Sequence, residues 1–138
     1  MQYLIWKEKF LSAKKRHPKI SSLKKKADAL YSEFIRKRFA DENGMVACCT
    51  CGTIKHWTEM DAGHFIGRSC NMLRYHPMNA HAQCRSCNRG GRRIMMYIKF
   101  MYEKYGATFI DVLLPLEQQT HTWTEKELRK IIEEVNNE

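Results

Sequence analysis

The sequence predicts one α+β domain, in which two short strands and a helix form a central ββα unit that further helices cover. Its 138 residues are the length of a single domain, and hydrophobic residues at 43% are enough to build a core. No internal repeat, low-complexity tract or Gly/Ser-rich linker divides the chain. We therefore treat residues 1–138 as one domain, with a basic helical extension at 1–44, the ββα core at 45–105 and C-terminal helices at 106–138.

A basic amphipathic helix is predicted within the N-terminal extension. Ser21 or Ser22 can cap a helix that runs to about Ala40, with apolar side chains on one side and basic ones on most of the rest. The basic face suits either a polyanion or simple solvation. Residues 1–20 fit a short amphipathic helix or a mobile arm. The apolar side consists of Leu23, Ala27, Leu30, Phe34 and Ile35, and the basic face of Lys24, Lys25, Lys26, Arg36, Lys37 and Arg38.

The central part of the chain has the order strand, loop, strand, helix. Residues 56–65 have the composition of a strand, residues 67–77 are typical of a loop, and residues 80–84 indicate a second short strand. Apolar residues then recur at helical spacing over residues 94–105 and stop at Gly106, a residue type that commonly follows a helix. The apolar stripe of this helix suits the core, or alternatively an interface with a second copy of the chain.

Two more helices are predicted after Gly106. Residues 109–114 indicate a short helix, and Thr124 followed by Glu127 is a capping-box signature. The second helix should therefore run from Glu125 to about residue 135. Its buried stripe is expected to consist of Leu128, Ile131, Ile132 and Val135.

Positive charge is concentrated near the N-terminus. The formal net charge is +9, with 12 basic and 3 acidic side chains in residues 1–40 against 3 and 7 in residues 111–138. A basic segment suits nucleic acid, because each neutralised phosphate releases counterions, and the acidic end should face away from it. A mean hydropathy of -0.57 and the absence of a long apolar run exclude a membrane span. The apolar stretch at residues 3–6 is too short for a signal peptide, so we expect a cytoplasmic protein.

The cysteines carry the strongest local signal. There are 6, of which four form two CxxC pairs and two, Cys49 and Cys70, are left over. Two CxxC turns can place four thiolates at the vertices of a tetrahedron, which is the geometry of structural zinc. The alternatives are a redox-active CxxC, or Cys49 replacing its neighbour through a shortened CxC. The expected ligands of a structural Zn²⁺ that braces the ββα unit are Cys48, Cys51, Cys84 and Cys87.

The segment from Cys48 to Arg93 resembles an HNH nuclease of the His-Me finger superfamily. It contains a CxxC, a histidine at the end of the first strand, an asparagine five residues before the third cysteine, and then CxxCN. The string DAGHFIGRSCNMLRYHPMNAHAQCRSCNRG is similar to the phage NinG (Rap) recombination nucleases, and the flanks FIRKRF, YEKYGATFIDVL and THTWTEKELRKI match too. The resemblance covers roughly residues 22–132. It implies a ββα-metal fold and an endonuclease that acts on branched DNA, such as Holliday junctions, in phage recombination.

Phosphodiester hydrolysis explains the residue types in this segment. It needs a base to deprotonate water and a metal such as Mg²⁺ to stabilise charge on the phosphate and the leaving oxygen. His64 is the candidate base, because histidine is available in its neutral form at physiological pH, although a core or zinc-binding histidine is the alternative. The resemblance implies that Asn79 ties the loop to the hairpin and that Asn88 ligates the catalytic metal. A turn residue and a helix cap are the competing readings of these asparagines.

The chain departs from the HNH pattern at Gly63, where many of these nucleases have an acidic metal ligand just before the histidine. Asp61 is the nearest carboxylate, and it shares a strand face with Gly63. His81 is the other candidate, since it lies on the same face as Asn79 in the second strand. Mg²⁺ prefers oxygen ligands, which favours Asp61, whereas Mn²⁺ accepts imidazole more readily and favours His81. Asp61 and His81 are therefore both kept as candidate ligands of the catalytic metal.

Arginines surround these residues in the sequence. Guanidinium groups bind phosphate in a bidentate way, and backbone N–H groups at a helix start also favour anions. Each arginine could instead be an ordinary surface charge. Arg74 also belongs to this group of arginines in the sequence. The expected contacts with the DNA backbone are Arg68, Arg85, Arg89, Arg92 and Arg93, together with the basic face of the N-terminal helix.

The expected function is therefore a metal-dependent DNA endonuclease. One alternative is a non-catalytic zinc module that binds DNA or RNA, and another is an HNH nuclease that nicks ordinary duplex DNA. The set of His64, Asn79 and Asn88 distinguishes the enzyme from the binding module, which would not require it. A nuclease acting symmetrically on a junction is expected to form a homodimer.

Overall fold

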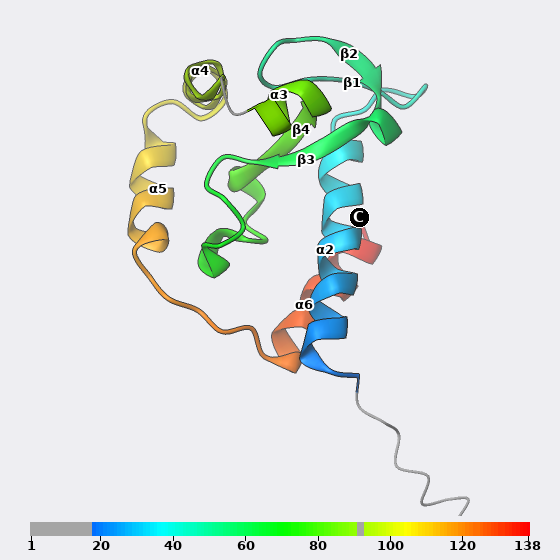
Figure 1. Ribbon diagram of the computed structural model, residues 1–138, viewed down its shortest axis with the longest axis vertical. Helices are drawn as coiled ribbons and strands as arrows, with labels where there is room; N and C mark the ends of the chain where they lie inside the picture. The colour runs from blue at the N-terminus through cyan, green and yellow to red at the C-terminus, as the bar shows by residue number, and fades with distance from the viewer. Residues whose placement is uncertain (1–17, 91–92) are drawn as a thin grey trace, which may run out of the picture.

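The computed structural model describes residues 18–90 and 93–138, and it shows a small sheet region between helices (Figure 1). The long helix α2 runs along one side of the molecule with α6 beside it, and α4 and α5 lie on the other side. Between them lie two separate antiparallel hairpins. This is the predicted α+β arrangement. The expectations for residues 1–17 and for Arg92 lie outside the described residues.

Helix α2 (Ile20–Lys37) supplies the wall against which the hairpins pack. It begins one residue before Ser21, and Lys19 occupies the cap position without a side-chain hydrogen bond, so the predicted serine cap is wrong. The backbone carbonyl of Lys19 instead accepts from the N–H groups of Ser22 and Leu23, which closes the first turn. The side chains that α2 buries are Leu23, Ala27, Tyr31 and Ile35.

The first hairpin, β1 (Met45–Ala47) and β2 (Ile54–His56), was not foreseen as strands. The predicted strand at 56–65 is wrong in its first half, because residues 57–59 form a 3₁₀ turn. The His56 side chain accepts a hydrogen bond from the Thr58 N–H and caps this turn. The turn lets the chain leave β2 and pair with a different strand, so one predicted strand becomes two.

The second hairpin carries the centre of the molecule. Strand β3 (Met60–His64) pairs antiparallel with β4 (Ala80–Cys84), with Met60 opposite Cys84 and His64 opposite Ala80. All five residues of β4 are buried, and this strand has the predicted bounds. Helix α3 (Arg85–Gly90) follows directly, so the second CxxC lies at the strand-to-helix junction as predicted.

The remaining helices close the structure on both sides. Helix α4 (Ile94–Tyr105) ends at Gly106, whose φ of 64° lies in the left-handed region, as the sequence predicted. The apolar residues of α4 do not all face the core, because Tyr97 and Met101 are buried whereas Met95 is 71% exposed. Helix α5 (Thr108–Glu117) is longer than expected. No helix among residues 18–90 and 93–138 is long and apolar enough to cross a bilayer.

Helix α6 (Glu125–Asn136) starts with the predicted capping box between Thr124 and Glu127. Its fully buried Leu128 joins the apolar cluster of α2 and Tyr75, while Ile131, Ile132 and Val135 are half-buried against it. The acidic C-terminal helix therefore packs along the basic N-terminal one.

Arg38, directly after α2, connects this helix to the second hairpin. Its guanidinium donates hydrogen bonds to the backbone carbonyls of Pro77, at 2.8 Å, and Ala80. Burial lowers the pKa of Arg38. The structure thus gives Arg38 a role within the fold besides the DNA contact that the sequence predicts.

We predict that Arg38→Met lowers the free energy of unfolding by about 1.5–3 kcal/mol, because the backbone carbonyls of Pro77 and Ala80 lose a charged donor. Lys37→Met is the matched control, since Lys37 makes an exposed pair with Glu33 and its loss should cost less than about 1 kcal/mol. Urea denaturation of the two variants measures the difference. Equal losses would contradict the structural role of Arg38.

Candidate functional site

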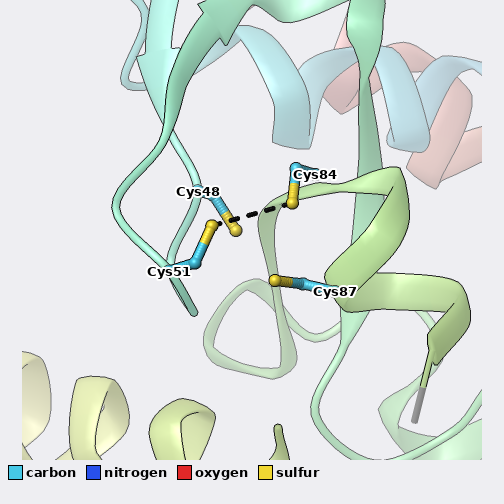
Figure 2. Close-up of side chains that lie close together, drawn as sticks. All are labelled: Cys48, Cys51, Cys84 and Cys87. Carbon is cyan, nitrogen blue, oxygen red and sulfur yellow. Dashed lines mark hydrogen bonds between the residues drawn. The ribbon is translucent and has the colours of Figure 1, made fainter. Parts of the chain in front are cut away.

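Four cysteine sulfurs converge between the two hairpins (Figure 2). Cys48 and Cys51 lie in the β1–β2 connection, Cys84 ends β4 and Cys87 lies in α3, and their Sγ atoms are all within 4.8 Å of one another. The Sγ atoms of Cys51 and Cys84 are 3.8 Å apart. Tetrahedral zinc with Zn–S bonds of about 2.3 Å requires about 3.8 Å between sulfurs. The four cysteines can therefore bind a zinc ion.

The two remaining cysteines lie outside this cluster. Cys49 is half-buried beside the apolar cluster of Tyr97 and Phe109, and burial raises the pKa of its thiol to about 12. It therefore stays a neutral thiol near neutral pH. Cys70 packs on the same cluster, with its sulfur 3.9 Å from the carbonyl oxygen of Glu117. Cys48, and not Cys49, supplies the first sulfur, as predicted.

His64 is the last residue of β3, and its ring is held from one side. Its Nε2 lies 3.0 Å from the backbone carbonyl oxygen of Arg74. Because a carbonyl only accepts, Nε2 carries the hydrogen and Nδ1 keeps its lone pair. Burial lowers the pKa of His64, and the charges of Arg68 and Arg74 lower it further, which outweighs the opposing effect of the Arg74 and Ala62 backbones. The ring is therefore neutral at pH 7, the state that a general base requires.

Asp61 and Asn88 meet beside this histidine. The side-chain amide of Asn88, on α3, donates to Asp61 Oδ2 at 2.9 Å, and Arg89 Nε lies 3.3 Å from the same oxygen. Adjacent ligands of octahedral Mg²⁺ are about 3 Å apart, because each bond is about 2.1 Å. The spacing of Asp61 and Asn88 therefore fits two neighbouring ligands of a hard cation, once the amide turns its oxygen inward.

His81 does not join this group. It is 1% exposed, and its two ring nitrogens lie 3.1 Å from the hydroxyl of Tyr97 and 2.8 Å from that of Tyr105. Burial lowers the pKa of His81 to about 3. The structure thus places His81 in a buried network with α4, which corrects the expectation that it ligates a catalytic metal. Of the two predicted alternatives, only Asp61 lies with Asn88.

Position 63, where the HNH pattern has an acidic residue, has little room for any side chain. A Cβ at this position would lie 2.2 Å from Oε1 and 2.8 Å from Cβ of Gln83 on the neighbouring strand. Gln83 is itself fixed, since its amide donates to the buried Thr50 hydroxyl at 2.6 Å. A side chain at position 63 has no room, whereas Asp61 on the same strand reaches Asn88.

Asn79 is buried directly before strand β4. Its Oδ1 accepts from the Ile66 N–H at 2.8 Å, and its Nδ2 donates to the carbonyls of Ile66 at 2.8 Å and Leu73 at 3.1 Å. These bonds tie the loop after β3 to the residue before β4. That loop also contains Arg74, whose carbonyl orients His64.

A cavity of about 630 Å³ lies between α2, the end of β3 and α3. His64, Asp61 and Asn88 line it, and Arg93 lines a smaller neighbouring cavity with His64 and Asn88. The lysines at 24–26 do not line the larger cavity, and Lys37 lies 4.3 Å from the Trp57 ring centroid. The predicted arginines that line the larger cavity are Arg36, Arg68, Arg85 and Arg89, together with Arg74.

The sequence reasoning missed Asp28 and Tyr31, two α2 residues that also line the larger cavity. The Tyr31 ring lies 6.4 Å from that of His64, between centroids. One signal was available for Asp28: it is an acidic residue directly after the buried Ala27 on a helix that is mostly basic.

We predict that Cys84→Ser abolishes binding of one zinc ion and cooperative folding, because a structural zinc site contributes folding free energy directly. Metal analysis of the purified protein and thermal unfolding with and without chelator test this. Cys70→Ser is the control and should keep both properties. A protein that melts cooperatively without bound zinc would contradict the prediction.

We also predict that Gly63→Ala destabilises the protein by about 1–3 kcal/mol through overpacking against Gln83. In the double variant Gly63→Ala/Gln83→Ala the contacts with the Gln83 amide are gone and only its Cβ remains, so the loss should be smaller than the sum of the two single losses. A double-mutant cycle by urea denaturation measures this coupling. Strict additivity would show that the two positions do not compete for space.

Comparison with known proteins places this chain in a family. Residues 3–138 match the family described as NinG: Bacteriophage Lambda NinG protein. The chain is 30% identical over 109 residues to "Protein ninG" of Salmonella phage P22, a match that covers 78% of this chain and 51% of the relative. The chain thus spans about half the length of that curated relative, and no solved structure matches it. The chain belongs to the NinG family.

Proposed function

We propose that this protein is a metal-dependent DNA endonuclease with the His-Me finger arrangement of HNH nucleases. The observation that carries the proposal is the position of His64, a neutral histidine with one nitrogen fixed by a carbonyl, in the same cavity as Asp61 and Asn88. The order of β3, loop, β4 and α3 matches the ββα unit that the resemblance implies. A binding module would not need a histidine held in this way.

His64 is the general base in this proposal. With Nε2–H donated to the Arg74 carbonyl, Nδ1 is the atom that takes the proton from an attacking water. The lowered pKa of His64 keeps this atom unprotonated at neutral pH. The carbonyl bond also opposes rotation of the ring, which preserves the direction of the lone pair.

Asp61 and Asn88 are the proposed ligands of Mg²⁺ or Mn²⁺. The 2.9 Å hydrogen bond from the Asn88 amide nitrogen to Asp61 holds the two side chains close enough for their oxygens to take adjacent positions around such an ion once the amide turns. A bound divalent ion would supply charge stabilisation for the phosphate and the leaving 3′ oxygen. The zinc ion at the four cysteines would be structural, because these residues offer it a closed set of ligands.

The arginines of the cavity are the proposed phosphate contacts. Arg36 comes from α2, Arg68 from the loop after β3, and Arg85 and Arg89 from α3, so the basic groups approach the cavity from different sides. A DNA backbone lying there would bring a phosphate to His64. Branched DNA in phage recombination is the substrate that the NinG resemblance implies, and the net charge of +9 suits any DNA.

We predict that the protein cleaves DNA with Mg²⁺ or Mn²⁺ and not with EDTA, and that His64→Ala lowers the rate by about 10²–10⁴-fold while binding DNA normally. Four-way junction, nicked duplex and linear duplex are compared as substrates. His121→Ala, a histidine outside the cavity, is the control and should cut at the rate of the unchanged protein.

If the unchanged protein binds DNA and cuts none of these substrates with either metal, the nuclease proposal is lost and a zinc-containing binding module remains. Cleavage of linear duplex as fast as junctions would remove only the proposed preference for branched DNA.

A further inference from the structure

We propose that Asp28 of α2 is a positioning residue for His64, acting through the side chain and backbone of Arg74. The inference rests on the proposed function, in which His64 is the general base. It extends the reaction centre beyond the ββα unit to the helix that precedes it.

The contact chain from Asp28 to His64 is continuous. Both carboxylate oxygens of Asp28 accept from Arg74, from Nε at 2.7 Å and from Nη2 at 2.6 Å. The backbone carbonyl of the same arginine lies 3.0 Å from His64 Nε2. Asp28 therefore fixes the residue whose carbonyl selects the tautomer and the orientation of the histidine ring.

Further bonds hold this chain in one geometry. Arg74 Nη1 donates to the Arg68 carbonyl at 2.9 Å, and the Tyr75 hydroxyl donates to Asp28 Oδ1 at 2.9 Å. The Arg74 and Asp28 side chains are 14% and 20% exposed. A bidentate pair that is mostly shielded from water and has these further partners is more rigid than an exposed ion pair.

The pair stays ionised under any assay condition near neutral pH. Burial acts to raise the pKa of Asp28, but hydrogen bonds from Arg74 and Tyr75 outweigh it and hold that pKa below its ordinary value. The same pairing raises the pKa of Arg74. Since the folded pKa of Asp28 is depressed, its contribution is present above about pH 4 and is lost only as the pH falls through the folded value.

The pairing also decides what Arg74 can do with DNA. Its guanidinium is neutralised by Asp28, unlike the exposed side chain of Arg68 in the same cavity wall. Removal of the Asp28 charge should therefore free a cation for phosphate while it releases the carbonyl that holds His64. DNA affinity and catalytic rate are then expected to change in opposite directions.

The test compares Asp28→Asn with Glu33→Gln, which makes the same charge change on the same helix at a residue outside the cavity. Long-range ¹H–¹⁵N spectra of ¹⁵N-histidine protein, with His64→Ala to assign the signal, report the His64 tautomer without DNA or metal. We expect Nε2–H His64 in the unchanged protein and in Glu33→Gln, and a mixture of tautomers in Asp28→Asn.

Cleavage kinetics give the second readout. We expect kcat to fall about tenfold or more in Asp28→Asn, with KM and the DNA Kd unchanged or lower, whereas a merely structural loss would weaken binding and rate together. Arg74→Lys, which keeps the charge and loses the bidentate geometry, should shift the tautomer in the same direction. If Asp28→Asn does not fold, the tautomer of His64 in Arg74→Lys tests the positioning role alone.

If the His64 tautomer is unaltered in folded Asp28→Asn and in folded Arg74→Lys, the positioning role is overturned, whatever the activity of these variants. A shifted tautomer in a protein whose unchanged form cuts no DNA supports the positioning contact and removes the proposed nuclease function. The two failures are therefore distinguishable.

Discussion

The convergence of four cysteine sulfurs on one point is the constraint on which the rest of the structure depends. The strands β1 and β2 have three residues each and α3 has six, and elements this short are not stable alone. The sulfurs join them at Cys84, which lies opposite Met60. Because that pairing sets the register of β3 and β4, it also sets where His64 and Asp61 stand relative to α3.

Buried polar bonds then distinguish the two faces of the second hairpin. The Tyr97 hydroxyl donates to the Gly63 carbonyl at 2.6 Å and lies next to His81, while Gln83 bonds to Thr50. His81 and Gln83 both lie on β4, so a shift of β4 by one residue would separate them from Tyr97 and Thr50, and these bonds specify the same register as the cysteines. His64, at the end of β3, is left to face the cavity.

The basic side chains fall into two groups with different physical roles. Arg38 donates to backbone carbonyls, and Arg74 is paired with Asp28 although it also lines the cavity, whereas Arg68 and Arg85 line the cavity with exposed side chains. The amino-acid composition does not show this division, because a basic side chain adds the same amount to the net charge whether it faces water or a backbone carbonyl. The exposed arginines of the cavity wall, Arg68 and Arg85, supply more of the field that would hold a phosphate than the paired Arg74.

The elements that could be predicted from the sequence are those with local signals: the strand Ala80–Cys84, the helix end at Gly106, the Thr124 capping box and the grouping of the four cysteines. A cap, a left-handed glycine or a CxxC turn acts within a few residues, so its pattern is readable without the fold. The tertiary structure decided the break at residues 57–59, the burial of His81, and the places of Arg38 and Asp28. These depend on partners that are distant in sequence, since a side chain's role follows from which group of opposite polarity the packed chain brings to it.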